Sequence, residues 1–599
     1  DLSGEDVLQT ITRHIHAKQL LVVLDNCEHQ IEVCARIVDR LLRECPQIRL
    51  LATSREPLRI EGETVWVVLP LSLPDTRAAL TSAAARQSEA VQLFVDRAVA
   101  VQRSFRLTEQ NAQSVVEVCR QLDGIPLALE LAAVCLRSLA LDEVALRLKD
   151  RFTLLTGGSR AALPRQQTLQ AALDWSYDLL EPDEQILFCQ LAVFAGGFTL
   201  EAAENVCKTP SLPVMPLLFR LVDKSLLLFE NERYRMLETV RQYASARLEA
   251  QDSFTTVFGH HLDWCVALAE QAEPRFSSAE QVFWSERLEV ENANLRTALN
   301  WALQHSAAEA GLRLISALWW FWSRRGYMAD IRHLLDAFLS LTKRSEGTVL
   351  DTVAKALSRV GAAATRQGDY ETARLFLDES LNLYRTLDNK SGSAFVYHQL
   401  GWLHHALKQF ASARSLYHDS LNITAQIGEK AHAQHADTLA YLGMLDYFEG
   451  RYSEARSCLN QSLTLKQRLG EVWGRAFADW NLGNVAFGEG DYHAAKRIYQ
   501  NVIREVRGLR DRWGLPSILE GIAYIAEIDG NSELAITLMS AAAVIREETV
   551  SPVPPVFREA YDRTLDTIRD HLDEDNFKRL WEAGQSIPIE DVIDLALNV

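Results

Sequence analysis

The sequence predicts a multidomain, mostly α-helical protein with a partial α/β unit at its start and an α-solenoid of helical repeats in its C-terminal half. Three observations support this fold class. Residues 1–75 alternate helical and strand-like segments, which is typical of parallel α/β structure. A helical pattern with few breaks follows from about residue 82, and residues 361–535 repeat a short pattern at a nearly constant interval. At 599 residues, the chain is long enough for several units with separate cores.

Composition narrows the classes of partner. The chain is 48% hydrophobic and 24% charged, as expected of a folded, helix-rich protein. Its formal net charge of −18 opposes the phosphate backbone of nucleic acids, so we expect no direct DNA contact from this chain. The nine cysteines form no C-x-x-C pair, which favours buried thiols in a reducing compartment. No apolar run approaches the roughly 20 residues of a membrane span. We therefore expect a cytoplasmic protein without a membrane anchor.

The apolar run Leu20–Leu24 predicts a strand, and because it does not alternate with polar residues, we expect a central strand covered by helices on both faces. Asp25 follows it directly, at the sheet edge where α/β proteins bind ligands. A carboxylate there can hold Mg²⁺ through water, and Glu28 could polarise an attacking water. The alternative is that Asp25 only caps the next helix.

Two further motifs follow this strand. The next predicted strand, Ile48–Ala52, ends in Thr53-Ser54-Arg55, where an arginine can reach a terminal phosphate. A structural arginine covering a helix end is the alternative. About seventy residues later, Gly124-Ile125-Pro126 predicts a turn that leads into a helix.

Residues 165–250 predict a second compact unit, set off by the cluster Gly157-Gly158-Ser159 and by Pro164. Several helical segments are followed by two short apolar runs, which is typical of a winged helix. The unit contains 12 acidic and 8 basic residues, the wrong sign for a reader of DNA grooves. We therefore interpret it as an intramolecular lid.

The repeat is the clearest internal signal. Its alanines are spaced by 40, 42, 40 and 40 residues, and a second register of glycines agrees with this period. Each unit then consists of a helix, a turn and a second helix whose alanine packs closely against the first. The turn pattern favours tetratricopeptide-like repeats over HEAT-type repeats. The repeated alanines are Ala373, Ala413, Ala455, Ala495 and Ala535, and the glycines are Gly361, Gly401, Gly443 and Gly483.

Together, Asp25-Asn26, Thr53-Ser54-Arg55 and Gly124-Ile125-Pro126 resemble the Walker B, sensor-arginine and GxP motifs of NB-ARC-like STAND ATPases. The resemblance extends to the predicted ATPases of LuxR-type and AfsR-type bacterial regulators, through LDNCEH, ATSREPL, LAVFAGGFTLEAA and MLETVRQYA. It implies a partial P-loop NTPase domain that uses ATP or ADP with Mg²⁺. Asp25 would then bind the metal, Arg55 would sense the γ-phosphate, and Pro126 would pack against adenine. The resemblance also places Asn26, Thr53, Gly124 and Leu127 at the nucleotide.

The chain departs from this family at two places. The triplet that contacts bound ADP in related switches is Met236-Leu237-Glu238 here, without the usual histidine, and Arg241 lies one helical turn away and could replace it. No glycine is followed by lysine, so the Walker A loop G-x-x-x-x-G-K-[ST] is missing from this sequence. We expect an N-terminally truncated chain that binds ATP weakly or not at all by itself, and whose parent is a slow regulatory ATPase.

Two functional hypotheses remain open. In the first, a protein or small-molecule inducer on the repeat array biases an ADP/ATP switch, with transcription controlled through a module outside this chain or through self-oligomerisation. In the second, the array is a nucleotide-independent scaffold that binds proteins or peptides. The domains we expect are a C-terminal part of an NTPase domain at 1–75, a helical NB-ARC-type domain at 76–164, a winged helix at 165–250, a helical linker at 251–345, the repeat array at 346–545, and capping helices at 546–599.

Overall fold

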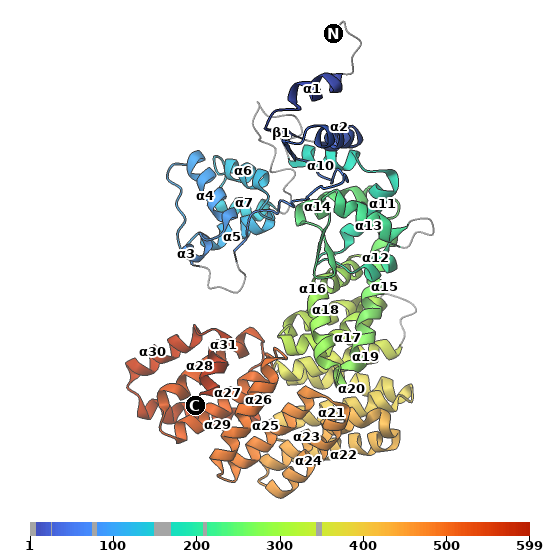
Figure 1. Cartoon of the computed structure of the whole chain (residues 1–599). Helices are drawn as coiled ribbons and strands as arrows, with labels where there is room; N and C mark the ends of the chain where they lie inside the picture. Colours follow the sequence, from blue (N-terminus) through green and yellow to red (C-terminus); the bar gives the residue numbers. More distant parts are fainter. Residues whose placement is uncertain are drawn as a thin grey trace. The chain divides into compact units, whose positions relative to one another are not determined.

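The computed structural model describes residues 7–25, 27–74, 81–148, 169–207, 213–342 and 350–598 (Figure 1). The chain divides into two compact units, Asp1–His261 and Leu262–Val599. Three of the predicted domain boundaries, near residues 75, 164 and 345, lie outside the described residues, as does the Gly157-Gly158-Ser159 cluster. The six domain ranges therefore stay predictions.

The first unit begins with a small parallel sheet. Helix α1 (Val7–Ile15) precedes strand β1 (Leu20–Leu24), which pairs in parallel with β2 (Ile48–Ala52). The 3-10 turn η1 (Cys27–Gln30) and helix α2 (Ile31–Glu44) connect the two strands. On one side of this sheet, Leu24 and Leu50 pack with Cys27 and Val38 in a common cluster.

The other side of the sheet corrects one prediction. Leu21, Val23 and Leu51 are 64%, 56% and 55% exposed, so β1 is not a strand covered on both faces within the described residues. An apolar run shows that both faces of a strand are apolar, but it does not identify the segments that cover them.

A helical subdomain follows the sheet. Its core is a single buried cluster in which Phe94, Val115, Leu129 and Val144 come from four different helices. Helix α6 starts at Pro126, whose fixed φ angle and missing N–H suit the first position of a helix. The helices are α3 (Ser82–Ala85), α4 (Glu89–Val101), α5 (Ala112–Gln121), α6 (Pro126–Cys135) and α7 (Leu141–Arg147).

Residues 169–249 combine helices with a small hairpin, as predicted. Strands β3 (Leu228–Glu230) and β4 (Arg233–Arg235) are antiparallel, and Phe198 forms an isolated bridge to Tyr234. The rings of Phe198 and Tyr234 stack, which ties the hairpin to the helices. The remaining elements are α10 (Leu169–Asp178), α11 (Pro182–Gln190), η3 (Leu191–Val193), α12 (Leu200–Val206), α13 (Val214–Asp223) and α14 (Glu238–Glu249). Helix α15 (Phe254–Ala272) then leads into the second unit.

The second unit is a stack of antiparallel helix pairs. It opens with η4 (Glu273–Ser277), α16 (Gln281–Gln304), α17 (Ala308–Arg325) and α18 (Met328–Thr342). Helices of 14 to 18 residues then alternate from α19 to α28: α19 (Leu350–Arg366), α20 (Tyr370–Thr386), α21 (Lys390–Ala406), α22 (Phe410–Ile427), α23 (His432–Phe448), α24 (Tyr452–Leu469), α25 (Val472–Gly488), α26 (Tyr492–Arg507), α27 (Leu515–Ile528) and α28 (Ser532–Glu548). The turn η5 (Gly428–Ala431) lies between α22 and α23, and α29 (Pro555–His571), α30 (Glu574–Gln585) and α31 (Ile589–Leu597) follow α28.

The repeated alanines are fully buried, as expected from the close packing predicted for them, and the repeated glycines also lie at close helix contacts. Each glycine of the second register lies in the first helix of a pair, at a point where a Cβ atom would collide with the second helix. A further repeated contact joins the two helices of each pair, because Ser380, Ser420 and Ser462 each donate a hydrogen bond of 2.7–2.9 Å to a backbone carbonyl 26 residues earlier. The residues that face the glycines recur sixteen positions later: Leu377, Tyr417, Leu459 and Tyr499.

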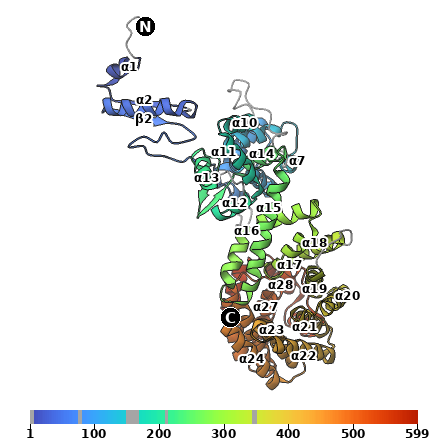
Figure 2. The same ribbon diagram turned by 90° about the vertical axis from the view of Figure 1, so that its right-hand side faces the viewer.

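The stack curves until its early helices meet its later ones (Figure 2). The side chain of Gln281 accepts a 2.9 Å hydrogen bond from the backbone N–H of Trp473. The backbone N–H of Arg512 donates a 2.9 Å hydrogen bond to the carbonyl of Arg324. Because these residues lie about 190 positions apart, the second unit is a closed structure rather than an open ribbon.

None of the described helices is both long and apolar enough to cross a membrane. The chain has two pairs of neighbouring histidines, His260-His261 and His404-His405. The second histidine of each pair is a core residue, since His261 and His405 are fully buried. Among the described residues, no group of three or more His, Cys, Asp or Glu side chains is arranged to hold a metal ion.

Candidate nucleotide-sensing site

The ends of the two parallel strands place Asp25 and Thr53 side by side. The register pairs Leu24 with Ala52, so the residue after each strand reaches the same edge of the sheet. The Thr53 hydroxyl donates a hydrogen bond to Oδ1 of Asp25, and the backbone N–H of Cys27 donates to the Thr53 carbonyl at 3.0 Å. Both Asp25 and Thr53 are exposed to solvent. Asn26, the other predicted residue of this motif, lies outside the described residues.

Glu28 and Arg55 form the second pair of the site. Nε of Arg55 lies 3.7 Å from Oε1 of Glu28, and the Glu28 side chain is only 6% exposed. The other oxygen of Glu28, Oε2, is buried without a hydrogen-bond partner in the described part of the chain. Nearby Cys27 is a buried thiol, and burial, its neighbour Cys34 and the carboxylate of Glu28 raise its pKa to about 11. Cys27 is therefore a neutral packing residue at physiological pH.

The loop that carries Arg55 contacts the helix-and-hairpin segment 169–249. The Arg55 guanidinium donates a hydrogen bond to the hydroxyl of Ser176 on α10. Ser225, in the turn after α13, donates its hydroxyl to the Arg55 carbonyl at 3.1 Å. Arg59 forms an ion pair with Asp223 at the end of α13. The predicted sensor arginine is thus held at two points, and its loop at a third, by one neighbouring segment.

The Gly124 turn is built for close backbone contact. Gly124 has a φ angle of +67°, which favours glycine, and its carbonyl accepts a 3.0 Å hydrogen bond from the N–H of Leu71. A side chain at Gly124 would collide with the Leu71 carbonyl. Pro126 starts α6, and Leu127 is partly buried against the core of the helical subdomain.

Asp123, directly before this turn, contacts the start of helix α14. Its carboxylate accepts hydrogen bonds from the backbone N–H of Thr239 at 2.9 Å and from the Thr239 hydroxyl at 3.2 Å. This satisfies a free donor in the first turn of α14. In that same turn, Glu238 accepts two 2.7 Å hydrogen bonds from Arg241, whose Nη1 also donates to the Ala192 carbonyl at 3.3 Å. The role predicted for Arg241 at a phosphate stays a prediction.

The segment 169–249 therefore joins two motifs that are distant in sequence. It holds Arg55 through Ser176 and Ser225, and it holds the Gly124 turn through Thr239. Sequence reasoning missed Ser176 and Ser225, because single serines carry no motif. Asp123 could have been found, since a short polar residue before Gly-x-Pro is typical of a turn with positive φ, and its φ angle is +54°.

The donor atoms present can be compared with what Mg²⁺ requires. Mg²⁺ in nucleotide sites is held by one or two protein oxygens, by phosphate oxygens and by water. The exposed carboxylate of Asp25 and the adjacent hydroxyl of Thr53 fit the protein part of such a shell.

Comparison with known proteins supports the regulator resemblance and the repeats. Residues 352–424 and 404–468 match the tetratricopeptide repeat family. Over 337 residues, the chain is 41% identical to "Putative HTH-type transcriptional regulator Rv0890c" of Mycobacterium tuberculosis, a stretch that covers 55% of this chain and 36% of that protein. It is also 38% identical over 266 residues to an uncharacterised protein of the same organism, which covers 43% of this chain and 64% of that protein. The chain thus carries tetratricopeptide repeats and is related to proteins named as transcriptional regulators, and it spans about a third of the length of the first of these relatives.

Solved structures show weaker similarity. A Signal Transduction ATPase with Numerous Domains (STAND) protein with a tetratricopeptide repeat sensor, from Pyrococcus horikoshii, is 14% identical and covers 99% of this chain and 85% of that chain, with a TM-score of 0.39. A Rap protein complexed with Competence and Sporulation Factor is 12% identical and covers 60% of this chain and 94% of that chain, also with a TM-score of 0.39. TM-scores this low do not define the fold of this chain.

Proposed function

We propose that this chain is the sensing part of a nucleotide-gated regulator, in which Arg55 reports the γ-phosphate of ATP to the segment 169–249. The contact between Arg55 and Ser176 carries this proposal. An arginine that binds a terminal phosphate must direct its guanidinium at that phosphate, and here the guanidinium is shared between Glu28 and Ser176. A phosphate competes with both partners, so ATP binding would loosen the hold of Arg55 on α10.

The neighbouring residues have matching roles in this proposal. Mg-ATP would supply the phosphate charge and the metal, and hydrolysis would remove the γ-phosphate that Arg55 senses. Asp25 and Thr53 would contribute oxygen ligands at the strand ends, and buried Glu28 would orient water near the phosphate. Pro126 and Leu127 would line the base, with Gly124 allowing the backbone to approach closely.

The Asp123–Thr239 contact gives the switch a second fixed point. Because α14 is tied to the Gly124 turn at its first residues, a nucleotide at that turn would also bias the position of α14. Two states of the segment 169–249 that differ in affinity for ADP and ATP are the physical requirement for such a switch.

The output in this proposal is control of transcription. The first of the two relatives is named as a putative HTH-type transcriptional regulator, and the matched stretch covers 36% of its length. The segment 165–250 has more acidic than basic residues, so DNA contact would belong to another part of the protein. Inducer binding would take place on the repeat array, because stacked repeats of this kind form curved binding surfaces. We place this regulator in the cytoplasm.

A second candidate function is a nucleotide-independent scaffold. The observation that favours it is the closure of the repeat array, which gives the second unit its own core and its own cavity without any contribution from the sheet. In that case the array would bind its ligand while nucleotides leave the protein unaffected.

Calorimetry with Mg-ATP and Mg-ADP separates the two functions. We would titrate this 599-residue chain and a chain extended at its N-terminus by the sequence encoded upstream. Tight binding by the extended chain alone is the expected result. If neither chain binds either nucleotide at millimolar concentration, the proposed switch is wrong and the scaffold is favoured.

A further inference from the structure

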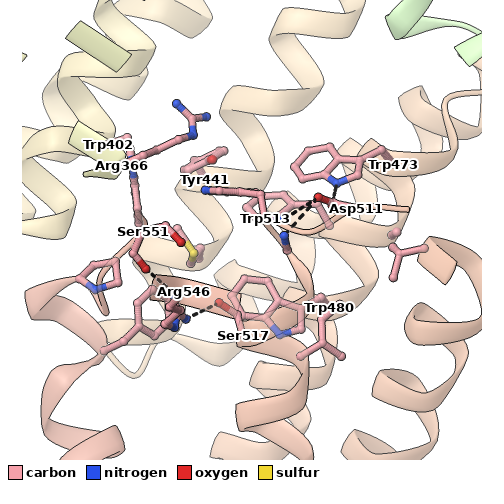
Figure 3. Close-up of a pocket in the computed structure, with 18 of the residues that line it drawn as sticks. Arg366, Trp402, Tyr441, Trp473, Trp480, Asp511, Trp513, Ser517, Arg546 and Ser551 are labelled. Carbon is pink, nitrogen blue, oxygen red and sulfur yellow. Dashed lines mark hydrogen bonds between the residues drawn. The ribbon is translucent and has the colours of Figure 1, made fainter. Parts of the chain in front are cut away.

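The second unit contains a cavity with many aromatic side chains in its wall (Figure 3). Its empty volume is about 790 Å³ when the open mouth is included. Its walls come from the first helices of successive pairs, α19, α21, α23, α25 and α27, together with parts of α26, α28 and α29 and the loops after α26 and α28. The main aromatic lining residues are Trp402, Tyr441, Trp473, Phe477, Trp480 and Trp513.

The closure of the array holds this cavity in shape. Trp473 is fixed through its backbone by Gln281, and its indole N–H donates to the carboxylate of Asp511. Asp511 also accepts a 3.0 Å hydrogen bond from the backbone N–H of Trp513. Both tryptophans are thus positioned before any ligand arrives, which lowers the entropic cost of binding.

Arg366 brings an uncompensated positive charge to this cavity. Its guanidinium lies 4.6 Å from the ring centre of Trp319 and 5.1 Å from that of Trp513, and Nη1 donates to the carbonyl of Ala362. No ion pair of Arg366 is present in the described part of the chain. Besides the phenol of Tyr441, the groups with the strongest electrostatic effect on the Arg366 guanidinium are two further cations, Arg324 and Arg359.

Arg324 adds a second cation behind the aromatic wall. It is 8% exposed, and its guanidinium carbon lies 3.1 Å from the ring centre of Trp473 and 4.6 Å from that of Trp513. Its Nε and Nη1 atoms have no hydrogen-bond partner among the described residues. Asp511 is its main countercharge, but that carboxylate is already engaged by N–H donors of Trp473, Trp513 and Gly514.

Arg546, the other arginine that lines this cavity, has its charge balanced by a carboxylate. Arg546 donates to both carboxylate oxygens of Glu520, at 2.6 and 2.8 Å, and to the Ser517 hydroxyl at 3.0 Å. Arg366 has no such partner among the residues that the structure describes. Burial lowers the pKa of Arg366 to about 10, so it remains protonated at neutral pH, and no carboxylate among the described residues pairs with it.

The neutral polar atoms around the cavity point to the same kind of ligand. The indole N–H groups of Trp402 and Trp480 are buried, and neither has a hydrogen-bond partner in the described part of the chain. Both atoms are donors and cannot accept. A buried donor without a partner costs free energy, and an acceptor on a ligand recovers it.

Aromatic cages more often bind cations, but here arginine side chains of the protein already lie over the faces of two of the tryptophan rings. The guanidiniums of Arg324 and Arg366 both lie over the ring of Trp513, and Arg324 also lies over that of Trp473, so an ammonium ligand would meet like charge. A neutral ligand would leave Arg366 uncompensated. An anion with a flat apolar body satisfies the rings, the donors and the charge together.

We propose that this cavity binds a small organic carboxylate with a flat apolar body, and that Arg366 holds the carboxylate. Binding does not depend on nucleotide, and only the role of this ligand as the inducer rests on the proposed function. Guanidinium is suited to carboxylate because two parallel N–H donors match its two oxygens.

The test uses the full 599-residue chain and three probes that share one ring system. These are 1-naphthaleneacetate, its uncharged amide 1-naphthaleneacetamide, and 1-naphthylmethylammonium. We expect calorimetry to show the acetate binding at least about tenfold more tightly than the amide, and the ammonium not binding. This comparison needs no substitution, so it does not depend on a variant that folds.

Two variants then locate the carboxylate. In Arg366→Gln, acetate affinity should fall to the level of the amide, while amide affinity stays unchanged. Arg468→Gln is the matched control, because Arg468 is exposed and outside the cavity. An acetate that binds no more tightly than the amide in the wild-type chain, failure of all three probes at millimolar concentration, or an acetate preference retained in Arg366→Gln would each overturn the proposal.

The same probes distinguish this inference from the proposed switch. If the acetate binds through Arg366 while the extended chain binds neither ATP nor ADP, the cavity inference stands and the proposed switch fails. If the extended chain binds ATP and ADP but no acetate, the switch stands and this inference fails.

Discussion

Arg55 and Glu28 face each other at the end of the two-stranded sheet, with 3.7 Å between Nε and Oε1. The pair is asymmetric, because Glu28 is almost fully buried and the Arg55 side chain is 37% exposed. The exposed partner is the one that can be recruited by a ligand. Ser176 and Ser225 then connect any movement of Arg55 to helices that are more than a hundred residues distant in sequence.

Removal of the Ser176 hydroxyl should release Arg55 for the phosphate. In the extended chain, Ser176→Ala is expected to raise ATP affinity relative to ADP by roughly fivefold, the equivalent of about 1 kcal/mol for one hydrogen bond. The control is Ser245→Ala on α14, which should leave the ratio unchanged. Calorimetric titration with both nucleotides measures the ratio of ATP affinity to ADP affinity. An unchanged ratio in Ser176→Ala would show that this contact does not restrain Arg55.

The repeated glycines give a direct test of packing. A Cβ atom at Gly401 would lie 2.5 Å from a ring carbon of Tyr417, which is fully buried. We expect Gly401→Ala to lower the free energy of unfolding by about 1–3 kcal/mol, because overpacking exceeds the gain in helix propensity. Urea denaturation checks this value.

Gly259→Ala is the matched control for that substitution. Gly259 lies in α15, and nothing is found within 4 Å of an added Cβ atom. The substitution Gly259→Ala should stabilise the protein by about 0.5–1 kcal/mol through helix propensity alone. If both substitutions have the same sign, close helix packing at Gly401 is not what the repeat pattern encodes.

Acid stability should depend on His405. Burial lowers the pKa of His405 to about 3, and neither ring nitrogen has a hydrogen-bond partner among the described residues. The unfolded state, with a histidine pKa near 6.5, binds more protons than the folded state between pH 6.5 and pH 3, so stability falls as pH falls through this window. One such group contributes a slope of about 1.4 kcal/mol per pH unit.

His405→Phe removes that slope and keeps a ring in a pocket lined by Phe410, Phe448 and Trp402. We expect the variant to lose less stability than the wild-type chain between pH 6.5 and pH 4.5. The urea unfolding midpoints of the wild-type chain and of His405→Phe, measured across this pH range, test the prediction. Parallel curves for the two proteins would mean that His405 becomes protonated without unfolding.

Much of the fold could be predicted because its signals are local or periodic. Constant spacing of Ala373, Ala413 and their equivalents identified the repeats, since each pair of helices packs through the same small residues. The order of apolar runs identified the parallel strand pair and the later hairpin. The covering of β1 was predicted wrongly, because the exposure of Leu21 and Val23 depends on which segments are present to pack on them.

Long-range contacts could not be predicted. Arg55 and Ser176 are 121 residues apart, and nothing near Ser176 in the sequence marks it as a partner. The aromatic cavity draws residues from Thr365 to Phe557, and it exists only because the array closes between Gln281 and Trp473. Periodicity predicts that helices stack, but the curvature of the stack follows from small rotations added over many repeats.

The measurement that tests the central claim most directly is the affinity of the extended chain and of its Arg55→Ala variant for Mg-ATP and Mg-ADP. Arg49→Ala serves as the control, because Arg49 is an exposed arginine on β2, the strand that precedes the Arg55 loop. The account predicts that Arg55→Ala loses preference for ATP while ADP affinity and folding are retained, and that Arg49→Ala behaves as wild type. Equal affinities for ATP and ADP in the wild-type protein and in Arg55→Ala alike would contradict it.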